Sequence, residues 1–327
     1  MSQPRTRHRF RKLHGILLLD KPSGPSSNQA LQKVRHLFRA EKAGHTGALD
    51  PLATGLLPIC FGEATKIAGH LLGARKAYET VARLGITTDT DDAEGQVLRQ
   101  RPVPVLNVAD INSALAKLTG RIQQVPPIYS ALKRGGEPLY VKARRGESIE
   151  LDAREVEVQQ FSLQSAHGLL DDAPTLRLAV ECGSGTYVRS LVRDLGELLG
   201  CGAHVVELRR LWVEPFSAPR MWTLDALQAL AEQGDAALEA CLLPIEAGLA
   251  AWPKVHLEAE QAQKLGQGQT LKGGFAPSGD VIACDMNGRA LGIAWVDEVG
   301  SLRSKRLFSW AAVTGQAPDD NGLEMGK

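Results

Sequence analysis

The sequence has few cysteines and no long apolar run, and these two absences argue against several classes of protein. Its 327 residues include five cysteines, none of them in a C-x-x-C pair. This pattern argues against a disulfide framework and a zinc site, and it fits a reducing cytoplasm. No apolar run approaches the roughly 20 residues of a membrane-spanning helix. The apolar residues 16–19, which follow a basic start, are too few for a signal peptide.

Net charge is nearly absent as well. The 38 lysines and arginines are balanced by 37 aspartates and glutamates, for a formal charge of +1. Nucleic-acid binding must then come from local clusters of positive charge rather than from the overall balance. The length favours two domains and a core that needs no cross-links. We expect a basic disordered tail at residues 1–12 and a polar disordered tail at residues 316–327.

The stretch Gly44 to Gly55, GHTGALDPLATG, has the composition of a shaped loop. Glycine frees the backbone angle φ and proline fixes it. The loop carries one histidine, His45, and one aspartate, Asp50, and Pro51 biases Asp50 toward an extended conformation. The small residues leave room for a ligand or a nucleic-acid strand to approach the backbone. The alternative is an ordinary Asp-Pro turn before the apolar run at residues 56–61.

Residue periodicity predicts alternating strands and helices, followed by a β-rich C-terminal part. Residues 244–253 are interpreted as a linker between the two parts. The pattern predicts strands at 15–20, 77–84, 155–163, 176–182 and 201–211, and helices at 28–38, 63–72, 107–118, 188–198 and 223–233. Beyond the linker it predicts a helix at 258–265 and strands at 281–285, 290–296 and 304–308.

Two segments carry clusters of one charge. The acidic loop at residues 87–95 lacks the glycine and terminal glutamate of a calcium-binding loop, so no metal site is predicted there. Residues 124–145 contain five cations in the run 133–145, opposed by the single acid Glu137, with interleaved prolines, glycines and aromatics. Such a composition suits a flexible arm that grips a phosphate backbone. The alternative is a solvated surface insertion.

An arginine stands where a helix disfavours it. Arg189 lies in the first turn of the predicted helix at 188–198, where a cation opposes the helix dipole. This placement indicates an anionic partner, either a carboxylate or a phosphate.

Six motifs occur in order between residues 15 and 250: KPSG (21–24), GHTGALDPLATG (44–55), RLGITTDTDDAEG (83–95), YSALK (129–133), GTYVRSLVRDLG (185–196) and GAHVVELRRL (202–211). In these motifs the chain resembles the bacterial TruB family of tRNA pseudouridine-55 synthases. The match over residues 44–55 is the most specific of the six. The C-terminal part looks like the small RNA-binding PUA domain that often ends such chains. This resemblance rests on its position in the chain and its β-rich pattern more than on a specific motif.

The resemblance implies an α/β (α+β) fold. It places a catalytic domain with a mixed, mostly antiparallel sheet at residues 13–250, including an RNA-gripping insertion at about 124–153. A β-rich PUA-like domain follows at residues 251–315. The implied reaction is isomerisation of the uridine at position 55 in the tRNA T-loop to pseudouridine. The resemblance implies tRNA as the partner and neither cofactor nor metal. From the cysteines and the short apolar runs we expect a cytoplasmic protein without membrane association, and nothing in the sequence demands more than a monomer.

The resemblance also implies roles for single residues. Asp50 is the expected nucleophile, which attacks the flipped-out nucleotide. Arg189 is expected to pair with Asp50, and a guanidinium favours the ionised carboxylate that an attack requires. The other expected contacts are Tyr78 stacking on the target base, His45 entering the RNA, and Tyr187 and Leu208 lining the pocket.

Three alternatives remain open. The first is a pseudouridine synthase that depends on a guide RNA and partner proteins. The second is a non-catalytic tRNA-folding chaperone. The third is an α/β enzyme acting on a small molecule, which the basic segment and the separate C-terminal part disfavour.

Overall fold

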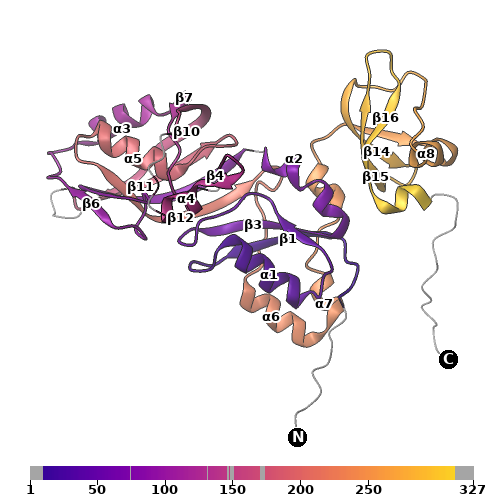
Figure 1. Ribbon diagram of the computed structural model, residues 1–327, viewed down its shortest axis with the longest axis horizontal. Coiled ribbons are helices and arrows are strands. Elements are labelled where there is room, and N and C mark those ends of the chain that lie inside the picture. Colours follow the sequence, from indigo (N-terminus) through magenta and orange to yellow (C-terminus); the bar gives the residue numbers. More distant parts are fainter. Residues whose placement is uncertain are drawn as a thin grey trace, which may run out of the picture.

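The computed structural model describes residues 10–73, 75–130, 132–145, 147, 151–169 and 174–313. Within these residues eight strands form one sheet in the order β1-β3-β12-β4-β11-β10-β7, with β2 paired to β3 (Figure 1). Every neighbouring pair is antiparallel except the short contact between β3 and β12. The strands are β1 (Gly15–Lys21), β2 (Ala43–His45), β3 (Thr54–Phe61), β4 (Lys76–Leu84), β7 (Gly120–Gln124), β10 (Arg154–His167), β11 (Thr175–Cys182) and β12 (Ala203–Val213).

Helices cover the sheet where the sequence places apolar residues at helical spacing. In α5 (Val188–Leu198) and α3 (Val108–Lys117) the buried side chains recur every three or four residues. Polar caps set the helix starts, as Ser26 does for α1 (Ser27–Leu37). The remaining elements of this part are a 3₁₀ helix η1 (Gly62–Lys66), α2 (Ala68–Leu72), a β5 (Ile86–Thr88) and β6 (Val97–Gln100) hairpin, α6 (Leu224–Gln233) and α7 (Asp235–Glu239).

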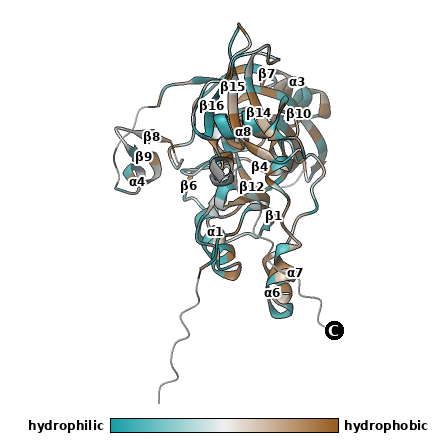
Figure 2. Cartoon of the chain, turned by 90° about the vertical axis from the view of Figure 1, so that its right-hand side faces the viewer, coloured by the Kyte–Doolittle hydropathy of each residue, from teal (hydrophilic) through white to brown (hydrophobic). Residues whose placement is uncertain are grey.

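The basic insertion leaves and re-enters the sheet at one point. Gln124 at the end of β7 pairs with Arg154 at the start of β10, so the chain between them is an excursion from two neighbouring strands. Its described part forms β8 (Lys133–Arg134), β9 (Glu137–Pro138) and α4 (Leu139–Arg144). Figure 2 shows these elements standing off the rest of the chain. The insertion therefore projects from the edge of the sheet.

The C-terminal unit is built on a second sheet. Its order is β13 (Lys254–Leu257), β14 (Gly279–Asp285), β15 (Ala290–Val296) and β16 (Leu302–Leu307), accompanied by α8 (Ala259–Gly266) and η3 (Ser309–Val313). The sequence did not predict β13, a four-residue strand that pairs parallel to β14. Figure 1 shows this unit at the yellow end of the chain.

Two sequence expectations need correction. The expected linker contains a 3₁₀ helix, η2 (Ile245–Leu249), because Ile245 and Leu249 are buried in an apolar cluster between the two units. The expected solvated tail at residues 1–12 is docked at its described end: Arg11 pairs with Ala40, and the Phe10 ring contacts His36. Residues 1–9 and 314–327 lie outside the described part, so the tail at 316–327 stays a prediction.

The described residues contain neither a disulfide bond nor a membrane-spanning helix. All five cysteines are unpaired and buried. No described helix is both long and apolar enough to cross a membrane.

Candidate active site

Two side chains of the N-terminal segment hold the Gly44–Gly55 loop by its backbone. The fully buried Lys21 ammonium donates to the carbonyls of Pro51 (3.2 Å) and Ala53 (2.7 Å). The Ser27 hydroxyl accepts from the Leu49 amide (2.7 Å) and donates to the carbonyl of the same residue (2.9 Å). These side chains satisfy backbone groups that an irregular loop cannot pair by itself. They fix the backbone on both sides of Asp50.

Arg210 of β12 holds the loop from another direction. Its guanidinium is 1% exposed and donates to the carbonyls of Leu56 (2.7 Å) and Gly47 (3.0 Å). Gly55 pairs with Arg210 across the short parallel contact of β3 and β12. Strand β12 therefore ties the far end of the loop to the central sheet.

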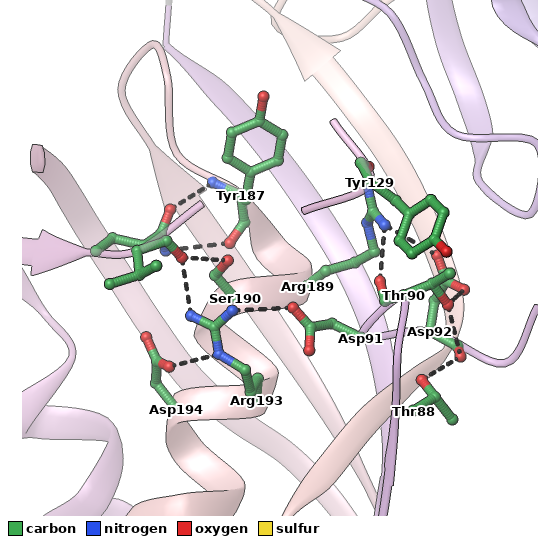
Figure 3. Close-up of polar contacts among 12 residues, drawn as sticks. Thr88, Thr90, Asp91, Asp92, Tyr129, Tyr187, Arg189, Ser190, Arg193 and Asp194 are labelled. Carbon is green, nitrogen blue, oxygen red and sulfur yellow. Dashed lines mark hydrogen bonds and ion pairs between the residues drawn. The ribbon is translucent and has the colours of Figure 1, made fainter. Parts of the chain in front are cut away.

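Arg189 of α5 brings Asp50 together with a second carboxylate. Its Nε lies 2.9 Å from Asp50 Oδ2, and its Nη1 lies 3.3 Å from Asp92 Oδ2. Nη1 also donates to the Thr90 carbonyl (2.8 Å), and Nη2 donates to the Tyr129 carbonyl (2.9 Å). Figure 3 shows the guanidinium between Tyr129, Thr90 and Asp92. The expected pairing of Arg189 with Asp50 is present as an ion pair. Nη1 and Nη2 donate hydrogen bonds, whereas Nε has none among the described residues.

The acidic loop supplies the second carboxylate, a role that the sequence did not reveal. Asp92 is 3% exposed, and its Oδ1 accepts from the Thr90 hydroxyl (2.5 Å) and the Glu94 amide (3.1 Å). The neighbouring Asp91 pairs with Arg193 at 3.0 Å. Arg189 and Arg193 lie four residues apart, hence on one face of α5. That spacing, set against two adjacent aspartates, is the signal that could have found this pairing.

Opposing effects set the protonation of Asp50. Burial raises the pKa of Asp50 above its ordinary value, and the nearby Asp92 carboxylate adds to this rise. Arg189 and Lys21 oppose the rise because a cation stabilises the carboxylate form. Burial also lowers the pKa of Lys21 to about 8, against the opposing effect of Asp50. The Asp50 side chain is only partly buried, with 38% of it exposed. It is nevertheless less acidic than a free aspartate, and Arg189 opposes this rise in pKa.

A cavity of about 290 Å³ opens beside this ion pair. Its wall contains five of the six predicted site residues, which come from the Gly44–Gly55 loop, from β4 and β12, and from the start of α5 with the residue before it: Asp50, Tyr78, Leu208, Arg189 and Tyr187. The other lining residues are Gly47, Ala48, Leu49, Leu72, Lys76, Ser130, Gly183, Ser184, Gly185, Thr186, Val188 and Arg210.

The two tyrosines are held in different ways. Tyr78 on β4 is 8% exposed, and burial raises the pKa of its phenol. Tyr187 precedes α5, where its amide donates to the Gln124 side chain (2.8 Å) and its carbonyl accepts from it (3.1 Å). The Arg154 guanidinium lies 5.1 Å from the centre of the Tyr187 ring. Tyr78 is therefore fixed by burial, and Tyr187 by its backbone and a cation–π contact.

His45 is the predicted site residue that the cavity wall does not include. It pairs with Ile59 where β2 meets β3, and its side chain is half-buried. Its Nδ1 is buried without a hydrogen-bond partner in the described part of the chain. Burial lowers the pKa of His45, and Arg210 lowers it further, so the neutral imidazole is favoured.

The basic insertion is described only in part. The side chains of Lys133, Arg134 and Arg144 lie outside the described residues. Arg145 is exposed and forms ion pairs with Glu137 (2.6 Å) and Glu147 (2.7 Å). Its charge is therefore shared with two carboxylates at the surface.

Comparisons with known proteins place this site in a family. Residues 35–188 match the N-terminal domain of TruB family pseudouridylate synthases. Residues 189–250 match the tRNA pseudouridylate synthase B C-terminal domain, and residues 253–308 match the C-terminal part of pseudouridine synthase II TruB.

Curated relatives are similar over almost the whole chain. The tRNA pseudouridine synthase B of Xanthomonas axonopodis pv. citri is 60% identical over 300 residues, which cover 92% of this chain and 96% of that protein. The protein of the same name from Xylella fastidiosa is 55% identical over 301 residues, covering 92% of this chain and 97% of the relative. The chain belongs to the TruB family. It is a pseudouridine synthase and hence an isomerase.

Solved structures that are distantly similar to this TruB-family chain confirm the expected fold. A chain from the crystal structure of a Cbf5-Nop10-Gar1 complex superposes with a TM-score of 0.69 at 22% identity, covering 92% of this chain and 85% of that one. A chain from an H/ACA RNP bound to a substrate RNA gives 0.68 at 21% identity, covering 90% and 85%. The mixed, mostly antiparallel sheet with a β-rich C-terminal unit is thus a shared architecture.

Proposed function

We propose that this TruB-family synthase converts the uridine at position 55 in the T-loop of tRNA to pseudouridine, with Asp50 as the nucleophile. One observation carries the proposal: the Asp50 carboxylate lies against the Arg189 guanidinium in the wall of the cavity. The substrate follows from the curated relatives, which are named tRNA pseudouridine synthase B. Position 55 and the T-loop follow from the motif resemblance.

The reaction rearranges one nucleotide without net gain or loss of atoms. The bond from uracil N1 to ribose C1′ breaks, the uracil turns, and a bond from C5 to C1′ forms. The proton on C5 leaves to solvent, and N1 gains one. Asp50 makes and later releases a covalent bond to the nucleotide, at either C6 of the base or C1′ of the ribose. Arg189 keeps the carboxylate ionised for this attack.

Chemistry on a base requires that the base leaves its stack. We assign Tyr78 and Leu208, on the neighbouring strands β4 and β12, to hold the flipped uracil by stacking and apolar contact. Stacking on an aromatic ring is worth roughly 1–3 kcal/mol per base. Tyr187 forms a further part of the pocket wall. His45 is assigned to the RNA outside the cavity, in the space that the flipped nucleotide leaves.

The rest of the chain is assigned to RNA binding. The insertion at about 124–153 projects beside the cavity and supplies cations to the T-arm, while the unit at 251–315 provides a second RNA contact. We further propose that the enzyme acts as a monomer. Five unpaired cysteines support a cytoplasmic location.

The comparisons favour a stand-alone enzyme over a guide-RNA-dependent one. Identity is 52–60% to the curated tRNA pseudouridine synthase B proteins, and about one fifth to chains from the Cbf5 and H/ACA structures. A chaperone without catalysis would have no need for a carboxylate and a guanidinium held in contact at a cavity wall. Both alternatives are outcomes of the same experiment.

The experiment measures tritium release from a tRNA transcript labelled at C5 of its uridines. The wild-type chain, without other proteins, guide RNA or metal, should release one equivalent of tritium per tRNA. The tritium leaves because C5 of the target uridine loses its hydrogen when it bonds to C1′. Asp50→Asn keeps the size of the side chain but removes the nucleophile. We expect release to fall by on the order of 10⁴-fold or more, with tRNA affinity in filter binding nearly unchanged.

Matched results separate the alternatives. Leu72→Ala, a change in the cavity wall that spares Asp50, is the control and should keep measurable release. Equal release by wild type and Asp50→Asn would refute the nucleophile assignment. Tight binding without release by the wild type would support the chaperone, and release only with added protein and guide RNA would support the guided enzyme.

A further inference from the structure

Two hydroxyls in the cavity wall, those of Ser130 and Thr186, are unpaired among the described residues and have no role in the mechanism described so far. Thr186 is half-buried, and Ser130 is the more buried of the two. Ser130 is 4% exposed and lines the cavity together with Asp50 and Tyr78. Its Oγ is buried and has no hydrogen-bond partner among the described residues. A buried hydroxyl left unpaired is destabilising, because it has given up its hydrogen bonds with water. Such a hydroxyl on a residue of a cavity wall is suited to a hydrogen bond with a ligand.

Other buried serines of this chain show what a structural hydroxyl looks like. Ser190 Oγ donates to the Val125 carbonyl at 2.9 Å. Ser27 Oγ is bonded to both backbone groups of Leu49. Each of these hydroxyls lies within hydrogen-bond distance of a partner in the protein. Ser130 lacks such a partner among the described residues and lies in the cavity wall; the Thr46 hydroxyl is also unpaired there but does not line the cavity.

Ser130 is also held in a defined position relative to the nucleophile. Its amide donates to the Ile128 carbonyl (3.0 Å) in a tight turn. The carbonyl of the preceding Tyr129 accepts from Arg189 Nη2 at 2.9 Å. The same guanidinium contacts Asp50 through Nε. One side chain therefore anchors both the nucleophile and the backbone that presents Ser130.

The flipped base requires recognition at its edge as well as its faces. In the proposed function Tyr78 and Leu208 hold the base by its faces, which is equally possible for any pyrimidine. Uracil differs from cytosine at its edge, where it presents the carbonyl oxygens O2 and O4 around N3–H. A hydroxyl donates well to such an oxygen.

We propose that the Ser130 hydroxyl donates a hydrogen bond to a carbonyl oxygen of the flipped uracil and thereby positions the base beside Asp50. The inference rests on the proposed function and adds to it a residue that positions the base. Ser130 is a substrate-positioning residue here, and no bond to it is made or broken.

The test needs first only the wild-type protein. Transcripts carry uridine, 2-thiouridine or 4-thiouridine at the target position, and the rate of C-glycoside formation is followed by nucleoside chromatography. Sulfur is a poor acceptor, so one of the two thio-substrates should react with kcat/KM lowered about ten-fold, the factor expected for one lost hydrogen bond. Equal values for all three substrates would overturn the proposal.

The Ser130→Ala variant, assayed with the same substrates, gives a double-mutant cycle between this side chain and the base oxygen. It should lose about ten-fold in kcat/KM with uridine and show no further loss with the sensitive thio-substrate. Ser190→Ala removes a buried, paired hydroxyl and is the control: its melting temperature should fall while its preference for oxygen over sulfur stays that of the wild type. A Ser130→Ala variant that still discriminates oxygen from sulfur would contradict the assignment. Failure of the wild type on uridine itself would instead contradict the proposed function.

Discussion

At the scale of single residues, the site depends on the balance between burial and one guanidinium. Asp50 lies in a setting that raises its pKa, and Arg189 and Lys21 oppose that rise. Burying a carboxylate is costly unless a cation and hydrogen bonds compensate. The contacts of Arg189 with Asp50, Asp92 and two carbonyls provide this compensation. We therefore expect catalysis to respond to pH through Asp50.

The first prediction concerns the acid limb of the pH–rate profile. Attack requires the carboxylate, so the single-turnover rate is full above the folded-state pKa of Asp50 and is lost as the pH falls through it. Because that pKa is raised, the limb should lie above the ordinary value of 3.8. Arg189→Gln removes an effect that lowers the pKa, so its limb should move to higher pH, with a lower plateau rate.

The matched comparison is Asp92→Asn, which should shift the acid limb in the opposite direction from Arg189→Gln. Asp92 raises the pKa of Asp50, so its neutralisation should move the acid limb to lower pH. The plateau rate should also fall because Arg189 loses an anchor. Single-turnover assays between pH 4 and 8, with folding checked by circular dichroism, measure both limbs. Limbs that shift in the same direction in both variants would contradict this electrostatic explanation.

Sequence reasoning at this scale found residues whose type is chemically conspicuous. Asp50 and Arg189 stood out because a lone aspartate in a glycine-rich loop and an arginine at a helix start both need explanation. Asp92 was missed because its partner lies 97 residues away in the sequence. The role of Arg210 could not be predicted, since it depends on the parallel contact of β3 and β12. Ser130 carries no signal before the cavity is known.

At the scale of elements, the contact of β3 with β12 is what closes the Gly44–Gly55 loop. Gly55 has a φ of +95°, and a Cβ at this position would lie 2.1 Å from the Arg210 carbonyl oxygen. Neither the backbone angle nor the space admits a side chain. The final glycine of the motif thus permits the close approach of two strands that anchors the loop.

The second prediction follows from this contact. Gly55→Ala should lower the free energy of unfolding by about 2–4 kcal/mol, from the left-handed backbone angle plus the overlap with β12. Gly24→Ala is the control, because Gly24 has a φ of +103° but a Cβ added there would meet no atom within 4 Å. It should cost only the conformational part, about 1–2 kcal/mol. Urea unfolding measures both, and equal losses would refute the role of the close approach.

Periodicity predicted the long elements well and the short ones poorly. The strands β1, β4, β11 and β12 and the helix α5 lie within a few residues of their expected ranges, since each has a buried face that repeats. The expected helix at 63–72 is instead a 3₁₀ helix followed by α2. The expected linker became η2 because its apolar residues are buried by a unit that lies later in the chain.

At the scale of the whole molecule, the C-terminal unit is docked rather than tethered. One apolar cluster joins Ile16 and Leu56 of the large sheet to Ile282 of the small sheet and to Phe308, which follows β16. Polar contacts border it: Glu63 accepts from the Ser309 amide at 2.7 Å. The C-terminal unit therefore has a defined position relative to the large sheet.

The third prediction tests this docking. Glu63→Gln weakens the charge-assisted bond to Ser309 and the ion pair with Lys66 at 2.7 Å. Misplacement of the C-terminal unit should raise the KM for full-length tRNA about three- to ten-fold and leave kcat unchanged. A T-arm stem-loop, too short to engage both parts, should react with unchanged KM.

A surface pair provides the control for that variant. Glu260→Gln removes an exposed ion pair with Lys264 within α8 and should change neither substrate's KM. An equal rise of KM for tRNA and stem-loop in Glu63→Gln would mean that Glu63 acts on the cavity and not on the placement of the unit.

The most direct test of the central claim is to map the modified nucleotide. An unmodified tRNA transcript is incubated with the purified chain alone, treated with carbodiimide and alkali, and read by primer extension. We predict a single stop in the T-loop, at the target uridine, that is absent with Asp50→Ala. No stop with the wild type, a stop elsewhere in the tRNA, or a persistent stop with Asp50→Ala would contradict the proposed function.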